Sequence, residues 1–159
     1  MATTLKLAGY QASAQTVAWT GATQKIDSLT DNEWTDLSDE IDNTTNLYAY
    51  AQIDLVLGSA AFTGTDCSIE VYIVPTVDGT NYPDWSGNSS SDAPEHEHMF
   101  VALLPLKAST SAKRVVSTSQ SPIELPQGKF KFALRSRANV TLAASGNTLY
   151  WRPLAYQSA

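Results

Sequence analysis

Apolar and polar residues alternate along much of this sequence, which is the pattern of β-strands that bury one face and expose the other. Residues 129–137 give the clearest example, because Phe130, Phe132 and Leu134 alternate there with polar and charged side chains. This alternation predicts a strand whose apolar side chains face a core. Its outer face then carries a row of four cations: Lys129, Lys131, Arg135 and Arg137.

The same periodicity predicts several further strands. Residues 47–57 indicate a long half-buried strand whose inner face begins at Leu47, and we expect residues 68–75 to be its antiparallel partner. Residues 99–106 are apolar on both faces, so we expect them in a central strand. Shorter or weaker strands are predicted at residues 16–19, 25–29, 34–41, 113–118, 121–125 and 148–153.

Helix signals are almost absent. The acidic residues of 31–34 resemble a first helical turn, but no apolar stripe of helical period follows them. We therefore predict an all-β fold of about 8–10 strands with little or no helix, in which two antiparallel sheets pack as a jelly-roll-like β-sandwich. The expected organisation is an N-terminal arm over residues 1–15 and a single β-sandwich domain over residues 16–159.

The composition is that of a protein with few charges and many hydroxyl groups. Charged residues make up 16% of the 159 residues, and there are 17 serines and 17 threonines. No apolar run reaches the length of about 18 residues that would span a membrane, and the first residues lack the features of a secretory signal. The net charge of −6 argues against a general affinity for nucleic acid.

The charge is unevenly distributed along the chain. Residues 1–106 hold two basic and 15 acidic groups, whereas residues 107–159 hold eight basic groups and one acid. The acidic and basic strands can pair inside one monomer, or the two poles can meet between neighbouring copies in a head-to-tail ring. A strong dependence of oligomer size on salt would favour the ring.

No combination of residues indicates catalysis. Cys67 is the one cysteine, so neither an intrachain disulfide nor a cysteine metal cluster can form, and we expect it to be a small buried hydrophobe. His96 and His98 offer two ligands where a closed metal site needs four, so they are structural or adventitious, or respond to pH among the neighbouring acids. Motifs for a serine nucleophile or a phosphate-binding glycine loop are missing. We predict a non-enzymatic protein without a cofactor or metal.

A long irregular segment, residues 77–97, separates two of the predicted strands. Loops of this length are uncommon in compact domains and usually have a function or form a contact arm. Tyr82 and Trp85 are large aromatic residues among polar neighbours in this segment, as in protein interfaces. They either anchor a partner or fold back to cover the edge of a sheet.

Four stretches of strand and turn residues stand out: 41–48 (IDNTTNLY), 68–82 (SIEVYIVPTVDGTNY), 125–131 (LPQGKFK) and 143–149 (AASGNTL). They resemble the small virion structural proteins of tailed bacteriophages, which are all-β subunits of the capsid exterior or tail. The resemblance spans residues 40–155. It implies a β-sandwich that self-associates, often as a homotrimer, binds other virion proteins and has no catalytic residues.

The function expected from this resemblance is that of a capsid decoration (cement) protein, which stabilises the head by binding the shell of major capsid protein. The alternatives are a tail, baseplate or fibre-base component and, from a different class, a carbohydrate-binding module with exposed Trp and Tyr. The expected partners are further copies of the chain and the major capsid protein or another virion protein, with no direct binding of nucleic acid or membrane. The expected location is the virion, after assembly in the bacterial cytoplasm. The residues expected at interfaces are Tyr82, Trp85, Lys131, Arg135 and Arg137.

Overall fold

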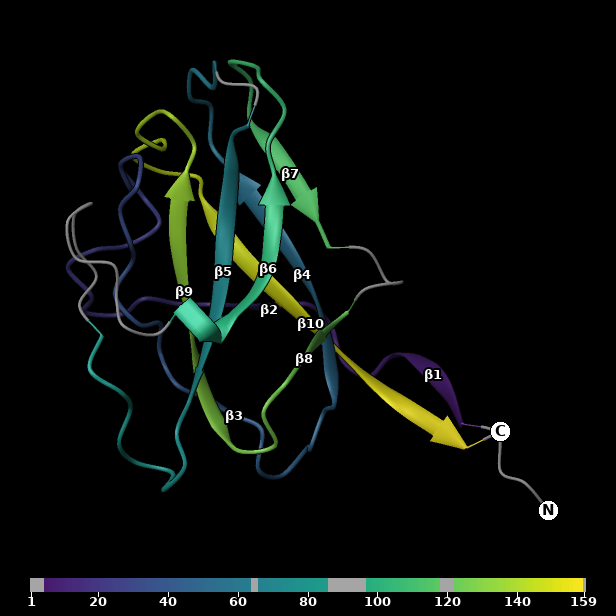
Figure 1. The fold of residues 1–159 in the computed structure, drawn as a ribbon. Coiled ribbons are helices and arrows are strands. Elements are labelled where there is room, and N and C mark those ends of the chain that lie inside the picture. Colours follow the sequence, from purple (N-terminus) through teal and green to yellow (C-terminus); the bar gives the residue numbers. More distant parts are fainter. Residues whose placement is uncertain (1–4, 64–65, 86–96, 118–121, 159) are drawn as a thin grey trace.

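The computed structural model describes residues 5–63, 66–85, 97–117 and 122–158, and it contains two antiparallel β-sheets that share one core (Figure 1). The helical structure in these residues is a single turn of 3-10 helix, η1 (Glu97–Met99). The predicted all-β class with little or no helix is therefore confirmed.

Each sheet is built around two long central strands. Sheet A has the spatial order β1 (Leu5–Tyr10), β10 (Thr148–Ser158), β4 (Tyr50–Leu57) and β7 (Lys113–Val116). The short strands β2 (Gln15–Thr16) and β8 (Ile123–Glu124) also belong to sheet A, where β2 pairs with β10 and β8 pairs with β4. Sheet B has the order β3 (Ile41–Asp42), β9 (Lys129–Arg137), β5 (Ser68–Pro75) and β6 (Phe100–Pro105).

The strand pairings are nested along the chain, which is the arrangement of a jelly roll. The first strand pairs with the last, β3 pairs with β9, β4 pairs with β7 and β8, and β5 pairs with β6 in the middle. The chain therefore forms one long hairpin that is rolled up, so that β4 also meets β10 and β5 also meets β9. This topology confirms the jelly-roll-like sandwich predicted from the strands and turns.

Inward-facing residues of the central strands fill the core between the sheets. Buried and half-buried residues alternate along β4, and Ile53 and Leu55 have no exposed surface. On β9, Phe130 and Phe132 are equally buried, and the Phe130 ring meets Trp151 of β10 edge-on at a centroid distance of 6.1 Å. Each such side chain contributes about 1.5–3 kcal/mol when buried, so the alternation determines which face of the strand lies inside.

A smaller apolar cluster covers the outer face of sheet B. Its buried members are Trp34, Tyr72 and Ala133, and its half-buried members are Leu37, Trp85 and Met99. The segments that precede β3 and follow β5 thus form a third layer over the central strands of this sheet. This cover explains why most residues of β5 are buried, whichever face they point to.

Residues 34–41, expected as a strand, instead run alongside β9 as an irregular segment. Trp34 makes an isolated ladder pair, and regular pairing begins only at β3. Thr35 and Ser38 explain the difference, because their hydroxyl groups accept hydrogen bonds of 2.9 Å and 2.8 Å from main-chain amides of β9. Side-chain oxygens here replace the carbonyl groups of a regular strand. Residues 25–29, also expected as a strand, form bends and turns.

The strand expected from residue 47 begins at Tyr50, and its first apolar residue is not in the core. Leu47 has a positive φ of 49° and is 50% exposed, whereas Tyr48 packs against the core. The buried Asn43 holds this turn, since its side chain donates to the Tyr48 carbonyl and accepts from the Tyr48 amide, both at 2.9 Å. The left-handed residue thus breaks the alternation that the sequence pattern suggests.

Two expectations about strand neighbours are wrong. Residues 47–57 and 68–75 do not pair, since β4 belongs to sheet A and β5 to sheet B. Residues 99–106, expected in a central strand, form β6 at the edge of sheet B. Apolar residues on both faces of a strand indicate contacts above and below it, but they carry no information about neighbours in the hydrogen-bonding direction.

The last residues of β10 extend past the neighbouring strand β4. β10 pairs with β4 from Thr148 to Leu154, and its residues from Tyr156 to Ser158 pair with β1. This two-stranded ribbon projects from one end of the sandwich (Figure 1). β1 lies within the arm expected over residues 1–15, so this part of the chain is joined to the C-terminal strand.

Candidate functional site

The residues that the sequence offers for metal binding do not gather into a site in the described part of the chain. Cys67 is buried, and its thiol donates to the carbonyl of Ala138 at 3.1 Å. His98 lies exposed in η1, while His96 lies outside the described residues. Across the described ranges, no three His, Cys, Asp or Glu side chains are grouped so that they could hold a metal ion. The same ranges contain no helix that is long and apolar enough to cross a membrane.

Tyr82, one of the residues expected at an interface, contacts charged side chains of its own chain. Its hydroxyl donates to Glu40 Oε2 at 3.0 Å, and the Lys131 ammonium lies 4.6 Å from the centre of its ring. Burial and the hydrogen bond to Glu40 raise the pKa of Tyr82 well above its usual value. Glu40 also binds Lys129 at 2.8 Å, and the hydrogen bond to Lys129 is the main cause that lowers the pKa of Glu40.

Trp85 packs onto the outer face of sheet B. Its indole N–H donates to the carbonyl of Thr35 at 2.9 Å. Its ring meets Trp34 edge-on at a centroid distance of 5.5 Å and lies 6.0 Å from the ring of Tyr72. Of the two roles expected for the aromatic residues of the long loop, these contacts support the one in which they fold back over a sheet.

Arg135 and Arg137 share one carboxylate on the neighbouring strand. Glu70 of β5 lies 3.7 Å from Arg135 and 3.3 Å from Arg137. Arg135 also lies over the ring of Trp34 at 4.7 Å, while Arg137 donates a further hydrogen bond to Asn32. The cations on β9 are thus engaged within the chain, although two carboxylates, Glu40 and Glu70, serve three of them and Lys131 lies over a ring. An interface role for these residues stays a prediction.

Most basic groups of the C-terminal third contact acids or aromatic rings of the preceding sequence. Ion pairs join Arg114 to Asp54, Lys129 to Glu40, and both Arg135 and Arg137 to Glu70. Lys113, Lys131 and Arg152 lie over the rings of Phe62, Tyr82 and Tyr10. Seven of the eight basic groups in residues 107–159 are therefore engaged within the chain. This supports the pairing of charges inside one monomer.

One apolar surface has no cover in the described part of the chain. It is a groove of about 460 Å³ between the edge strand β6 and the opposite edge formed by β7 and the start of β8. We define this β6–β7 trough by Val101, Leu103, Val115, Val116, Pro122 and Ile123. Leu103 is 53% exposed and Val116 is 45% exposed, as is Phe100 at the start of β6. Such a concentration of exposed apolar side chains is typical of an interaction site.

β6 also exposes its main chain along the trough. Among the described residues it pairs with β5 alone, so its other edge presents free amide and carbonyl groups. Two features protect this edge: a bulge near Val101, and Pro105 at the end of the strand. Charged side chains, another common protection of edge strands, are missing from residues 99–106. The sequence signal for this surface is the apolar character of both strand faces, which predicts a central strand but here marks an exposed edge.

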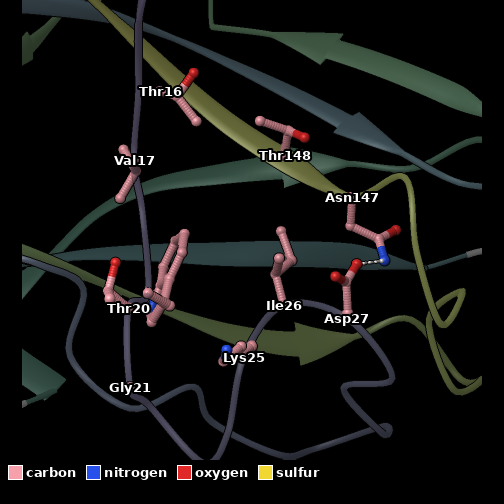
Figure 2. Close-up of a pocket in the computed structure, with 10 residues that line it drawn as sticks. Thr16, Val17, Thr20, Gly21, Lys25, Ile26, Asp27, Asn147 and Thr148 are labelled. Carbon is pink, nitrogen blue, oxygen red and sulfur yellow. Dashed lines mark hydrogen bonds between the residues drawn. The ribbon is translucent and has the colours of Figure 1, made fainter.

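A second hollow, of about 450 Å³, is polar and lies at the other edge of sheet A, beside β2 (Figure 2). We define this threonine pocket by its lining: Thr16, Val17, Trp19, Thr20, Gly21, Lys25, Ile26, Asp27, Asn147 and Thr148. Asn147 is 8% exposed and donates to Asp27 at 2.6 Å, which joins two walls of the pocket. No local sequence pattern indicates it, because its walls come from segments that are far apart in the chain.

The pairings define this chain as an all-β protein with a two-sheet jelly-roll topology. Comparison with protein-family models, with curated proteins and with solved structures gives no match. The described surface includes two hollows, the apolar β6–β7 trough and the polar threonine pocket, while the aromatic cluster around Trp34 covers the outer face of sheet B.

Proposed function

We propose that this protein is a non-enzymatic structural protein of a bacteriophage virion, and specifically a capsid decoration (cement) protein. In this proposal it self-associates, as a homotrimer, and binds the shell of major capsid protein to stabilise the head. The observation that carries the proposal is the β6–β7 trough, an apolar groove that the described residues leave uncovered, beside a strand edge that they leave unpaired. The stretches that resemble virion proteins support the same function.

Apolar surface beside an open strand edge is unfavourable in an isolated monomer and promotes pairing with another chain. A segment of a neighbouring subunit that lies in the trough would cover Leu103 and Val116 and supply hydrogen bonds to β6. Burial contributes about 1.5–3 kcal/mol for each such side chain. Several modest contacts of this kind around a shell add up through multivalency.

The rest of the molecule suits a rigid building block that acts through its shape. Its basic groups are mostly engaged within the chain, and the Trp34 cluster closes the outer face of sheet B. The projecting ribbon of β1 and β10 offers a further contact element. Two-stranded ribbons are marginally stable on their own, so docking on a neighbouring subunit would stabilise this one.

The proposed location is the virion, with assembly in the cytoplasm of the bacterial host. A buried free thiol at Cys67 is compatible with that reducing compartment. Further copies of this chain and the major capsid protein are the proposed partners, and neither nucleic acid nor membrane is among them. A net charge of −6 supports the exclusion of nucleic acid.

A tail, baseplate or fibre-base protein is the second candidate, because the trough and the projecting ribbon would serve equally well in a tail assembly. The copy number in purified virions distinguishes the two. A stained gel is expected to show hundreds of copies per particle for a decoration protein and about a dozen or fewer for a tail component, as the symmetry of the two structures requires. A dozen or fewer copies would contradict the proposed function.

Leu103→Lys tests the trough itself. The side chain is half exposed, so the fold tolerates lysine, but a charge in an apolar contact is expected to weaken self-association and head binding at least tenfold, or by about 1.4 kcal/mol. Val77→Lys is the matched control, because Val77 is fully exposed and lies outside the trough. Sedimentation velocity measures self-association. Cosedimentation with heads that lack the protein measures head binding. Unchanged behaviour of Leu103→Lys would remove the trough as an interface.

A further inference from the structure

The threonine pocket has a chemistry different from that of the trough, and it lies at the other edge of sheet A (Figure 2). We propose that it binds one neutral sugar residue, such as the terminal unit of a surface polysaccharide. Its volume of about 450 Å³ falls in the range of small-molecule sites, about 300–1,000 Å³. The inference goes beyond the proposed structural function and does not depend on it.

Free hydroxyl groups form much of the pocket wall. Within the described structure, the hydroxyls of Thr16, Thr20 and Thr148 have no hydrogen-bond partner, although all three residues line the hollow. Each hydroxyl can donate one hydrogen bond and accept two. A ligand that carries several hydroxyl groups of its own is the class that such a wall complements. Figure 2 shows these threonines on opposite sides of the hollow, Thr20 on one side and Thr148 on the other.

The floor of the pocket is apolar. Trp19 and Ile26 line it, and both are buried except for the small surface that faces the hollow. The indole N–H of Trp19 already donates to the carbonyl of Asp36 at 2.9 Å, so the ring offers the pocket only its apolar surface. A pyranose ring combines C–H groups on its faces with hydroxyl groups around its rim. It would therefore satisfy the floor and the wall at the same time.

The carboxylate of Asp27 is held in place before any ligand arrives. Asn147 donates to Asp27 Oδ1 at 2.6 Å and also to the carbonyl of Ala143 at 2.6 Å. The side-chain oxygen of Asn147 in turn accepts from the amide of Gly58 at 3.0 Å. These bonds fix one oxygen of Asp27 and leave the second, Oδ2, for a ligand hydroxyl. Such preorganisation lowers the entropic cost of binding.

One charge of each sign disfavours a ligand that carries a net charge. Lys25 and Asp27 both line the pocket, and Lys25 has no ion-pair partner in the described structure. A phosphate, a sulfate or an acidic sugar would meet the Asp27 carboxylate, and a cation would meet the Lys25 ammonium. A neutral sugar instead accepts from the ammonium and donates to the carboxylate, and hydrogen bonds to charged groups are stronger than those between neutral groups.

The position of the pocket keeps it accessible in an assembly. The trough follows the β7 edge of sheet A, whereas the threonine pocket lies beside β2, at the edge that β10 separates from β4. A subunit that docks in the trough therefore leaves the pocket open. A virion protein arranged in this way would hold sugar residues while it remains attached to its neighbours.

The test titrates the full chain with the methyl glycosides of glucose, galactose, mannose, rhamnose and N-acetylglucosamine, followed by isothermal titration calorimetry and by amide chemical shifts. Saturable binding of at least one of them, with shifts confined to residues around Trp19 and Thr148, is the expected result. Methyl glucuronide and sodium sulfate are the charged comparison probes and are expected to bind more weakly. Failure of all five neutral glycosides to bind, or stronger binding of either charged probe, would overturn the proposal.

Two conservative variants localise the binding. Thr148→Val keeps the shape but removes a hydroxyl, and Asp27→Asn keeps the hydrogen bond to Asn147 but removes the charge. Each is expected to weaken the glycoside affinity about fivefold or more while the melting temperature stays close to that of the unaltered chain. Thr45→Val, at an exposed turn outside the pocket, is the control and should have no effect. Equal affinities of all three variants would place the binding elsewhere and contradict the proposal.

Discussion

Glu70 accepts two hydrogen bonds and forms one longer ion pair on the outer face of sheet B. The Tyr72 hydroxyl donates to it at 2.8 Å, and the guanidinium groups of Arg135 and Arg137 flank it. The Glu70 side chain is 17% exposed and that of Arg135 is 12% exposed, so water replaces a lost contact poorly. Arg135 Nε is already buried without a partner in the described structure. At this depth, removal of one member leaves the others desolvated and uncompensated.

Glu70→Gln is therefore expected to lower the free energy of unfolding by about 2–3 kcal/mol, between the effects of exposed and fully buried ion pairs. Urea denaturation measures the change. Glu124→Gln is the matched control, because this acid on β8 is exposed, and its effect should stay within about 0.5 kcal/mol. Similar losses in the two variants would show that the arginine cluster has no special role.

Asp78 makes the stability of the folded chain depend on pH in the acidic range. Its carboxylate accepts from the amides of Asn81 and Thr80 and from the side chains of Asn81 and Thr76. These hydrogen bonds hold the pKa of Asp78 far below its usual value of 3.8, and the bond from the main-chain amide of Asn81 contributes most. Because the folded chain keeps this group ionised while the unfolded chain protonates it, the stabilisation is present above about pH 4 and is lost as the pH falls further.

Asp78→Asn should consequently flatten the acid limb of the stability curve. The variant is expected to melt at a lower temperature than the unaltered chain at neutral pH and to lose less stability on acidification below about pH 4. Asn81→Ala, which removes one of the donors and keeps the carboxylate, should give an intermediate slope. Thermal unfolding followed by circular dichroism at several pH values measures all three. Parallel curves would contradict the assignment.

At the scale of elements, the sequence pattern located the strands best where residues pack on a sheet face. β5 and β9 have the predicted bounds, because their apolar alternation is uninterrupted and the turn at Pro126 and Gly128 leads directly into β9. The segment through Thr35 and Ser38 is not the strand that the pattern predicts, because its hydroxyl groups accept hydrogen bonds from β9 amides where a regular strand would use carbonyl groups. The period of apolar residues shows which side chains share a face of a strand. It gives no sign of a segment in which side-chain hydroxyl groups replace main-chain groups as hydrogen-bond acceptors.

The candidate sites were partly foreseeable for the same reason. The sequence singles out Trp85 and Arg135, whose interface role stays a prediction, but it does not give the direction in which they point, which depends on Trp34 and Glu70 elsewhere in the chain. The threonine pocket left no local signal at all. Its walls meet only because β2 and the start of β10 are neighbours in sheet A.

The end of β4 approaches the turn before β10 so closely that only glycine fits at residue 58. A Cβ atom on Gly58 would lie 2.5 Å from the Ser145 carbonyl oxygen and 2.7 Å from Ala143 Cβ. Gly58→Ala is expected to lower the free energy of unfolding by about 2 kcal/mol or more, since main chain has to move. Gly128→Ala is the control, as its nearest neighbour would be 3.9 Å away, and it should change stability by less than about 1 kcal/mol. Urea denaturation curves that coincide would contradict this packing argument.

For the whole molecule, the nested topology explains why basic groups of the C-terminal part meet acids of the preceding sequence. Acidic β3 and β5 precede residue 107 and both pair with basic β9, so Asp42 lies opposite Lys129 and Glu70 lies opposite Arg135. β4 pairs with β7 in the same way, and this brings Asp54 to Arg114. The rolled hairpin thus brings the basic part of the sequence onto the acidic part, and seven of the eight basic groups in residues 107–159 are engaged before any second copy is present.

Self-association of this protein is accordingly expected to respond to salt as an apolar contact does. Sodium chloride should leave the dissociation constant measured by sedimentation velocity nearly unchanged, and sodium sulfate should lower it, because sulfate strengthens apolar burial. A ring held by opposite poles would dissociate instead as salt screens exposed charges. Lys107→Gln further distinguishes the apolar contact from the charged ring. Lys107 is the basic group of residues 107–159 for which the described structure gives no contact. Its removal should not alter the oligomer, and dissociation of this variant or of the unaltered chain in sodium chloride would favour the charged ring over the trough.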